Sequence, residues 1–295
     1  MTKIISCKTL AFILALTFVY TSTALAESNL VPAKAQSGKE VAVPEHAIEK
    51  APGLYYLGES FDEDSGQMVE GYMIVHPRDG KAKGGKKGKP DNGTDPEPSS
   101  PTAACYGFIA NGAKWKSIEG WEVDPTNIRS LDHNEVFNKL DYSIGKWEDA
   151  TDGVLDGSGA NVFGSGIINT SGDVAADQVS TDGRNEVMFG DLDAGTIGVT
   201  IVWGRFGGRP QSRQIVEWDQ VYNEIDFDWD ISETGTSSKM DFESIATHEL
   251  GHAMGMADLY EANCSAMSMY GYGSEGQIHA RSLEDGDING INELY

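Results

Sequence analysis

Residues 246–273 read ATHELGHAMGMADLYEANCSAMSMYGYG and place two histidines around a glutamate. His248 and His252 are four residues apart, so on a helix their imidazoles project from the same face and can approach one metal ion. Glu249 then lies beside that ion without having to bind it, which is where a base for a bound water is needed. A glycine lets the chain turn, and Asp258 follows on the returning loop. Two nitrogens, one carboxylate and an open fourth position are typical of a catalytic zinc site.

The same residues also permit an ordinary interpretation. A bare H-E-x-x-H can occur on a buried helix without a metal, and Asp258 could be a solvated or capping aspartate. However, the chain has only six histidines, and two of them stand at ligand spacing around a glutamate. A glycine, an aspartate and a methionine-containing loop follow them. The combination favours a metal site, because the longer pattern is far more restrictive than the short one.

The segment HELGHAMGMAD, followed by SMYGYG, resembles the motif of the metzincin zinc peptidases, H-E-x-x-H-x-x-G-x-x-H/D with a later methionine turn. Residues 281–295, RSLEDGDINGINELY, resemble the last helix of the matrixin branch. The resemblance implies an α+β, metzincin-like zincin fold: a twisted, mixed five-stranded sheet with a long first helix, an active-site helix and a C-terminal helix. It implies a zinc endopeptidase whose Zn²⁺ ligands are His248, His252 and Asp258, with Glu249 as general base.

The resemblance also assigns supporting residues. Met269 corresponds to the methionine beneath the zinc, with Met267 as the competing candidate. Tyr270 and Tyr272 correspond to the wall of the substrate pocket. Both methionines could instead be ordinary packing residues, because methionine is a common filler of apolar cores.

Three features depart from the usual matrixin pattern. Asp258 stands where most members have a histidine, which would put more negative charge on the zinc and moderate its acidity. Gly286 and Asp287 stand where the last helix normally carries paired acids, so an ion pair from a trimmed N-terminus to that pair is in doubt. No PRCGxPD segment precedes the main domain, so latency through a cysteine on zinc cannot be assumed.

Composition divides the chain into four parts. Residues 1–26 carry lysines, a short apolar run and an A-L-A ending, which predict a cleaved secretory signal peptide rather than a membrane anchor. Residues 27–77 include a predicted β-hairpin, too small to be stable by itself, and form either a propeptide or a retained module. Residues 78–104 are rich in Gly, Lys, Pro and Ser and predict a flexible linker that is easily cut. Residues 105–295 are the expected catalytic domain.

Hydrophobic spacing predicts three helices and a mixed sheet in the catalytic domain. One helix begins after Asp132, a second runs from about Phe242 to Gly255 with Asp241 as N-cap, and the third lies within 282–295. Four strand-like runs lie between the first two helices, at residues 159–167, 185–192, 196–204 and 214–229. The run 196–204 corresponds to the family's upper-rim strand, along which an extended substrate would bind, unless it is an interior strand.

Charge and cysteine content narrow the function. The chain has 22 Lys+Arg against 46 Asp+Glu, a formal charge of -24, which argues against nucleic acid as a partner and leaves a protein or peptide substrate. Once the signal is removed, Cys105 and Cys264 remain and most simply form one disulfide in an oxidising compartment, the alternative being two free thiols. We expect a secreted, monomeric protein that does not stay inserted in a membrane.

Two further hypotheses concern calcium and the loss of activity. Aspartates in glycine-containing loops could bind Ca²⁺, although the D-x-D-x-D-G pattern is absent and solvated loops are commoner. They are Asp173, Asp177, Asp182, Asp191 and Asp193. The competing functions are a catalytically inactive secreted adhesion or binding module that keeps the fold and the metal, and a structural protein without metal. An inactive module would have little reason to keep Glu249.

Overall fold

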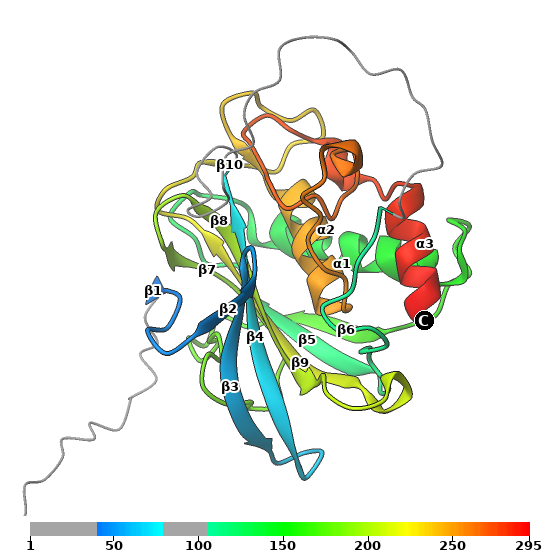
Figure 1. The fold of residues 1–295 in the computed structure, drawn as a ribbon. Helices are drawn as coiled ribbons and strands as arrows, with labels where there is room; N and C mark the ends of the chain where they lie inside the picture. Colours follow the sequence, from blue (N-terminus) through cyan, green and yellow to red (C-terminus); the bar gives the residue numbers. More distant parts are fainter. Residues whose placement is uncertain (1–39, 79–104) are drawn as a thin grey trace, which may run out of the picture. The chain divides into compact units, whose positions relative to one another are not determined.

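The structure of the chain is a computed structural model that describes residues 40–78 and 105–295. The predicted signal peptide and all but the first residue of the predicted linker lie outside these ranges. Both described ranges belong to one compact unit, an α+β arrangement of one large mixed sheet and three α-helices, as predicted (Figure 1). Within these ranges, no helix is long and apolar enough to cross a bilayer.

Nine strands form the large sheet of the described residues. Their order is β2-β3-β4-β8-β9-β7-β5-β6, and β1 pairs with β7. The strands are β1 (Glu40–Val41), β2 (Ile48–Ala51), β3 (Leu54–Asp62), β4 (Gln67–Pro77), β5 (Glu119–Asp124), β6 (Phe163–Ile168), β7 (Glu186–Leu192), β8 (Thr196–Arg205) and β9 (Gln214–Asn223). Two short strands, β10 (Trp229–Asp230) and β11 (Met240–Asp241), pair separately.

The sheet is larger than the five strands expected. Strands β5 to β9 supply those five, with β5, β6, β7 and β9 parallel and β8 antiparallel to β9. The predicted hairpin is present as β3 and β4, but it does not stand apart, because β4 pairs with β8 from Glu70 opposite Gly204 to Pro77 opposite Thr196. Strand β8 is therefore an interior strand, and all of its residues except the last are buried.

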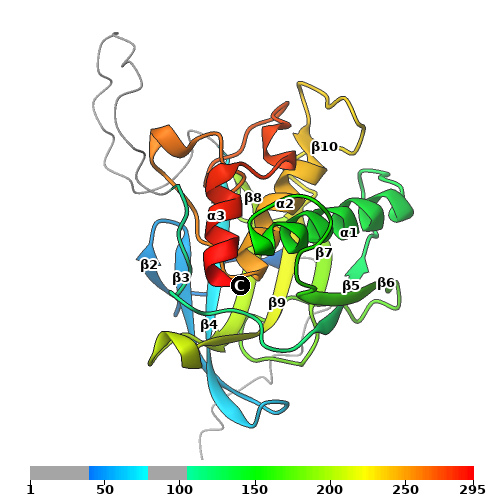
Figure 2. The ribbon, with the colours of Figure 1, turned by 90° about the vertical axis from the view of Figure 1, so that its right-hand side faces the viewer.

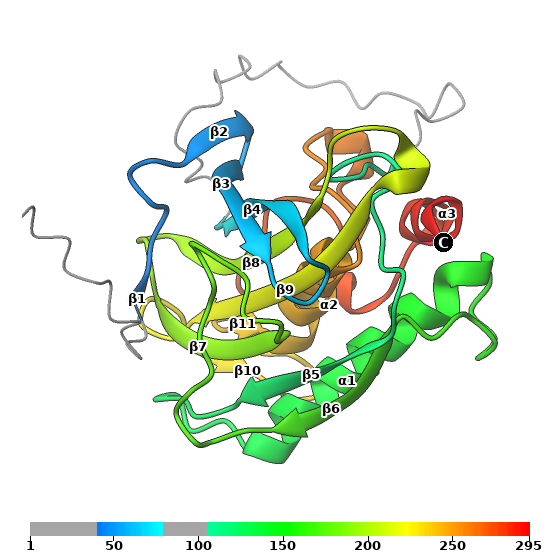
Figure 3. The same cartoon turned by 90° about the horizontal axis from the view of Figure 1, so that it is seen from below.

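Three α-helices complete the fold: α1 (His133–Asp149), α2 (Phe242–Ala253) and α3 (Asp285–Leu294). The predicted N-caps are present, since the Asp132 side chain accepts the N–H groups of Asn134 and Glu135, and Asp241 accepts that of Ser244. Figures 2 and 3 show α1 and α2 on the same side of the sheet, with α3 near the C-terminus beside them. Short 3₁₀ turns are η1 (Ala150–Asp152), η2 (Pro210–Ser212), η3 (Ala262–Cys264) and η4 (His279–Arg281).

Helix α2 is buried along its whole length, and tryptophans hold it in place. Trp147 of α1 donates to the carbonyl oxygen of Thr247 at 2.7 Å, and Trp115 donates to that of Ala253 at 2.8 Å. A Cβ atom on Gly251 would overlap the Trp147 ring, so the glycine permits a close approach of α1 to α2. The helix that carries the motif is thus fixed against α1 and the sheet.

The predicted disulfide is present. Cys105 and Cys264 are bonded, with their Cα atoms 5.4 Å apart. The bond ties the start of the second described range to the loop that follows Asp258.

Candidate active site

Helix α2 presents two histidines with their Nε2 atoms together. His248 Nδ1 lies 2.7 Å from the carbonyl oxygen of Ser268, and His252 Nδ1 lies 3.0 Å from that of Met256. Because a carbonyl oxygen can only accept, each Nδ1 carries the proton and each Nε2 is left with a lone pair. The two Nε2 atoms face each other at 3.1 Å. Two acceptors this close repel each other unless a positive charge lies near both.

Asp258 completes the group from the loop after α2. Gly255, at a φ of 105°, turns the chain back through a conformation that favours glycine. Asp258 Oδ1 lies 3.2 Å from His248 Nε2 and 3.4 Å from His252 Nε2. Burial alone would raise the pKa of Asp258, but positive charge on the two imidazoles, once they are protonated at Nε2 in the metal-free site, holds it well below its ordinary range. The Tyr260 hydroxyl, 2.9 Å from Oδ2, holds the other carboxylate oxygen.

These three side chains fit a zinc ion. Their donor atoms all lie within 4.8 Å of one another, and Asp258 Oδ1 accepts no hydrogen bond from the described residues. Two neutral imidazole nitrogens and a carboxylate oxygen form a common ligand set for catalytic zinc. The carbonyl groups on both Nδ1 atoms orient the rings, as the outer partners of zinc-bound histidines usually do.

Glu249 lies between this group and the sheet, fully buried. Its Oε2 accepts a 2.6 Å hydrogen bond from the Thr200 hydroxyl of β8, and its Oε1 lies 3.3 Å from His76 Nδ1 of β4. Gly198 makes room for it, since a Cβ atom there would lie 2.8 Å from Oε1. Burial acts to raise the pKa of Glu249, but His76 and His248 hold it below its ordinary value. The carboxylate is therefore oriented by Thr200 and kept charged.

The two candidate methionines occupy different places. Met269 is fully buried, and a Cβ atom on Gly251, between the two histidines of α2, would overlap its sulfur. The Met267 sulfur lies instead against Gly286 of α3. Of the two, Met269 is therefore the methionine that packs against α2.

Asp287 of α3 fixes the turn that contains Met269. Its carboxylate accepts the N–H groups of Ser268 at 2.9 Å, Met269 at 3.2 Å and Glu284 at 2.9 Å. Burial raises the pKa of Asp287 to about 6. Asp287 therefore holds the turn that contains Met269. Because the Ser268 carbonyl oxygen in this turn faces His248 Nδ1, Asp287 also supports the orientation of His248.

The comparison with protein families agrees with this geometry. A model of the matrixin family, Peptidase_M10, matches residues 207–295. The match begins before β9 and includes α2, the loop with Asp258, Met269 and α3. It supports a matrixin-like metalloprotease domain and, with it, zinc dependence. The β4 and β8 strands lie outside the matched residues.

A pocket opens next to His248. Tyr270 and Tyr272 both line it, with their ring centroids 5.7 Å apart, so these residues lie where the resemblance predicted a pocket wall. The other lining residues come from β4, α2 and the chain from Met267 to Ala280: His76, Ser244, Ile245, His248, Met267, Ser268, Gly273, Ser274, Gln277, His279 and Ala280.

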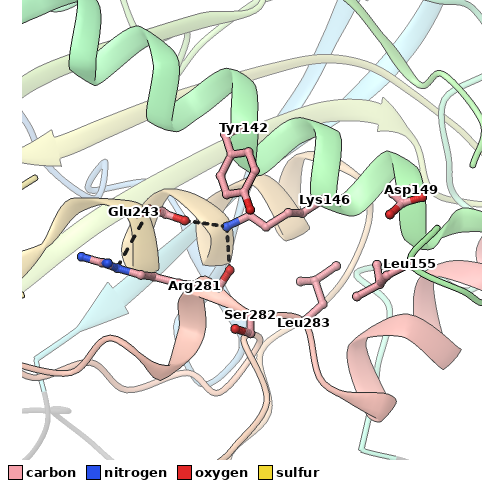
Figure 4. A pocket seen from close by; sticks show the side chains of 8 residues that line it. All are labelled: Tyr142, Lys146, Asp149, Leu155, Glu243, Arg281, Ser282 and Leu283. Atoms are coloured by element: carbon pink, nitrogen blue, oxygen red, sulfur yellow. Dashed lines mark hydrogen bonds and ion pairs between the residues drawn. The ribbon is translucent and has the colours of Figure 1, made fainter. Parts of the chain in front are cut away.

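A second pocket lies away from the histidines, between α1, α2 and the chain before α3 (Figure 4). Lys146 Nζ lies 3.1 Å from Glu243 Oε1 and donates to the Arg281 carbonyl oxygen at 2.6 Å. Glu243 also pairs with Lys139 at 2.8 Å. Lys146 and Glu243, which line this pocket, are thus paired with each other and with neighbouring groups. We therefore interpret the pocket as part of the packing between α1 and α2.

Sequence reasoning missed three residues that the structure brings to the site. Thr200 lies in a predicted strand, and Tyr260 follows Asp258 closely, but nothing in the spacing showed that their hydroxyl groups would face the carboxylates. His76 stands far from the motif in the sequence, at the end of a strand-like run. Only the pairing of β4 with β8 reveals its place beside Glu249.

The aspartates considered for calcium do not come together as a set. Asp177 and Asp182 lie with Glu217 of β9, their oxygens within 4.8 Å of one another. Asp173 is not part of this group; it accepts hydrogen bonds from Asn169 and Ser171, and Arg184 lies 3.7 Å from it and 3.8 Å from Asp182. Calcium binding by any of them stays a prediction.

Proposed function

We propose that this chain is a secreted, zinc-dependent endopeptidase that cleaves protein or peptide substrates as a monomer. One observation carries the proposal: the Nε2 atoms of His248 and His252 and Oδ1 of Asp258 converge on one point, with the Glu249 carboxylate beside them. The match to the matrixin family over the same residues supports it. The disulfide between Cys105 and Cys264 agrees with an oxidising compartment.

In this proposal His248, His252 and Asp258 hold the zinc. When bound, zinc supplies a Lewis acid that polarises a substrate carbonyl and makes a neighbouring water more acidic. Glu249 accepts a proton from the attacking water, while the Thr200 hydroxyl fixes the carboxylate through its other oxygen. As the water oxygen bonds to the carbonyl carbon and the C–N bond breaks, Glu249 returns the proton to the leaving amine. No side-chain nucleophile takes part.

The position of Glu249 favours an enzyme over an inactive metal-binding module. A fully buried carboxylate, with the Thr200 hydroxyl donating to one oxygen and His76 Nδ1 3.3 Å from the other, is costly to fold. A module that only binds metal would gain nothing from a buried carboxylate next to the ligands, whereas a general base has to stand beside the metal.

The proposal is tested by replacing Glu249 with its uncharged isostere. Glu249→Gln should retain zinc and lose at least about 100-fold in the rate of casein cleavage, because general-base catalysis contributes about 10²–10⁴-fold. Glu261→Gln, which changes an exposed carboxylate on the loop after Asp258, is the matched control and should cleave normally. Equal cleavage by all three proteins would refute the role of Glu249.

A further inference from the structure

Strand β4 covers the edge of β8 to which an extended substrate would bind. The two strands are antiparallel, and the register sets His76 opposite Gly198 and Val75 opposite Val199. Gly198 is the residue whose Cβ position lies against Glu249. An extended peptide that adds to β8 uses these same main-chain groups. The chain therefore pairs its own strand with β8 at the position nearest the candidate base.

The end of β4 is held from the opposite side as well. The Arg78 N–H donates to the Gly195 carbonyl oxygen at 2.8 Å, before β8, while Gly273 donates its N–H to the Pro77 carbonyl oxygen at 3.5 Å. Arg78 and Gly273 form a parallel bridge, and the Arg78 guanidinium pairs with Glu275 at 2.9 Å. Residues 76–78 thus lie between β8 and the chain that follows the methionine turn.

The pairing of β4 with β8 places the His76 side chain in the candidate site. It is 2% exposed, and its ring centroid lies 3.9 Å from that of His248. The described residues give neither of its ring nitrogens a hydrogen bond of good geometry. One ring nitrogen each of His76 and His248 and one carboxylate oxygen of Glu249 lie within 4.8 Å of one another. Since burying an unpartnered polar ring costs free energy, the pairing of β4 with β8 holds His76 there.

The turn between β2 and β3 makes a second contact on the other side of the ligands. The Tyr260 hydroxyl lies 2.9 Å from the Pro52 carbonyl oxygen as well as from Asp258 Oδ2. The Gly53 carbonyl oxygen accepts the N–H of Val75, which joins this turn to β4. The N-terminal range therefore covers both Glu249 and Asp258.

We propose that residues 74–78 are a built-in occupant of the peptide-binding cleft, and that His76 blocks Glu249 in the intact chain. The inference rests on the proposed function, because only an endopeptidase would bind a peptide substrate in this cleft. A substrate that pairs with β8 has to displace β4 first. The intact chain therefore binds peptides, and small molecules that bind the zinc, only in the fraction of molecules whose cleft is open. The N-terminal range thereby acts as an inhibitor of its own site, without a cysteine.

The test uses the zinc-loaded full chain and two variants that open the site by different means. His76→Ala removes the blocking ring, and Arg78→Glu replaces the ion pair with Glu275 by a repulsion. The charge swap Arg78→Glu with Glu275→Arg should restore the blocked state. The matched control is His46→Ala, since His46 belongs to the same N-terminal range but contacts the Leu57 carbonyl oxygen at 3.0 Å, away from the site.

Two readouts separate occupancy of the cleft from catalysis. One is the Kd of acetohydroxamic acid, a zinc-binding probe, measured by calorimetry, and the other is the cleavage rate of a quenched fluorescent peptide. We expect both variants to bind the probe about 10-fold more tightly, as for a site that is open about a tenth of the time. Arg78→Glu, which also loosens the strand, should cleave the peptide about 10-fold faster. The charge swap and His46→Ala should match the original chain.

The outcomes distinguish the inference from the proposed function. Tighter probe binding without cleavage in any protein would support the occupied cleft and overturn the endopeptidase. Equal probe binding and equal cleavage in all proteins would support the endopeptidase and overturn the occupied cleft.

Discussion

Removing the disulfide should destabilise the fold by an amount that the chain length determines. Cys105 and Cys264 are separated by 159 positions. Closing a loop of this length in the unfolded chain costs entropy equivalent to about 5 kcal/mol at 25 °C. Measured effects commonly fall below this limit, so the double variant Cys105→Ser/Cys264→Ser should lose about 2–5 kcal/mol of unfolding free energy.

Urea denaturation followed by tryptophan fluorescence measures this loss. Four tryptophans, Trp147, Trp203, Trp218 and Trp229, are almost fully buried and report on the core. The measurement is made in EDTA, because a metal bound only to the folded state would add its own stabilisation. Ser265→Ala, on the same loop as Cys264, is the control and should change stability by less than about 0.5 kcal/mol. A loss below about 1 kcal/mol in the double variant would refute the loop-closure argument.

Three further predictions follow from individual contacts. Tyr260→Phe removes the hydroxyl on Asp258 and should weaken zinc binding about 10–100-fold in competition with a fluorescent chelator, whereas unchanged affinity would show that Tyr260 does not support the ligand. Gly251→Ala should lower the unfolding free energy by about 1–3 kcal/mol, because its Cβ would overlap Met269, while Gly145→Ala on α1 meets nothing and should not destabilise. In EDTA the melting temperature should fall as the pH rises from about 5 to 9. Burial raises the pKa of several carboxyl groups in the folded state above their values in the unfolded state. The stability that these protonated groups contribute at low pH is therefore lost as the pH rises through the folded-state pKa values. The groups concerned, with their pKa values, are Asp177 (about 7), Glu186 (about 8) and Glu217 (about 9). A flat profile contradicts the burial argument, and a slope that Ca²⁺ in excess over the EDTA abolishes would favour the calcium hypothesis.

Local patterns in the sequence were enough to predict much of the fold of residues 105–295. The spacing of His248 and His252, the N-cap Asp241 and the glycine turn all act over a few residues, so α2 and its histidines follow from sequence. The match to the matrixin family over residues 207–295 supports the domain that this motif predicted. Strand β5 was missed, although Trp121 and Val123 alternate with polar residues, as expected for a half-buried strand.

The placement of the N-terminal range could not be predicted in this way. The pairing of β4 with β8 joins residues more than a hundred positions apart, and no local rule states which strand covers a given edge. The interior position of β8 was one of two alternatives, and only its partner β4 decided between them. His76 and its contact with Glu249 depend entirely on that pairing.

Zinc content, measured together with the identity of the ligands, tests the central claim most directly. The full chain, purified and analysed by mass spectrometry for metals and by X-ray absorption, should contain about one zinc per chain with nitrogen and oxygen neighbours at about 2.0–2.2 Å. The zinc should be lost in His252→Ala and retained in Glu249→Gln. A chain that binds no zinc, or one that keeps it without His252, would contradict the account.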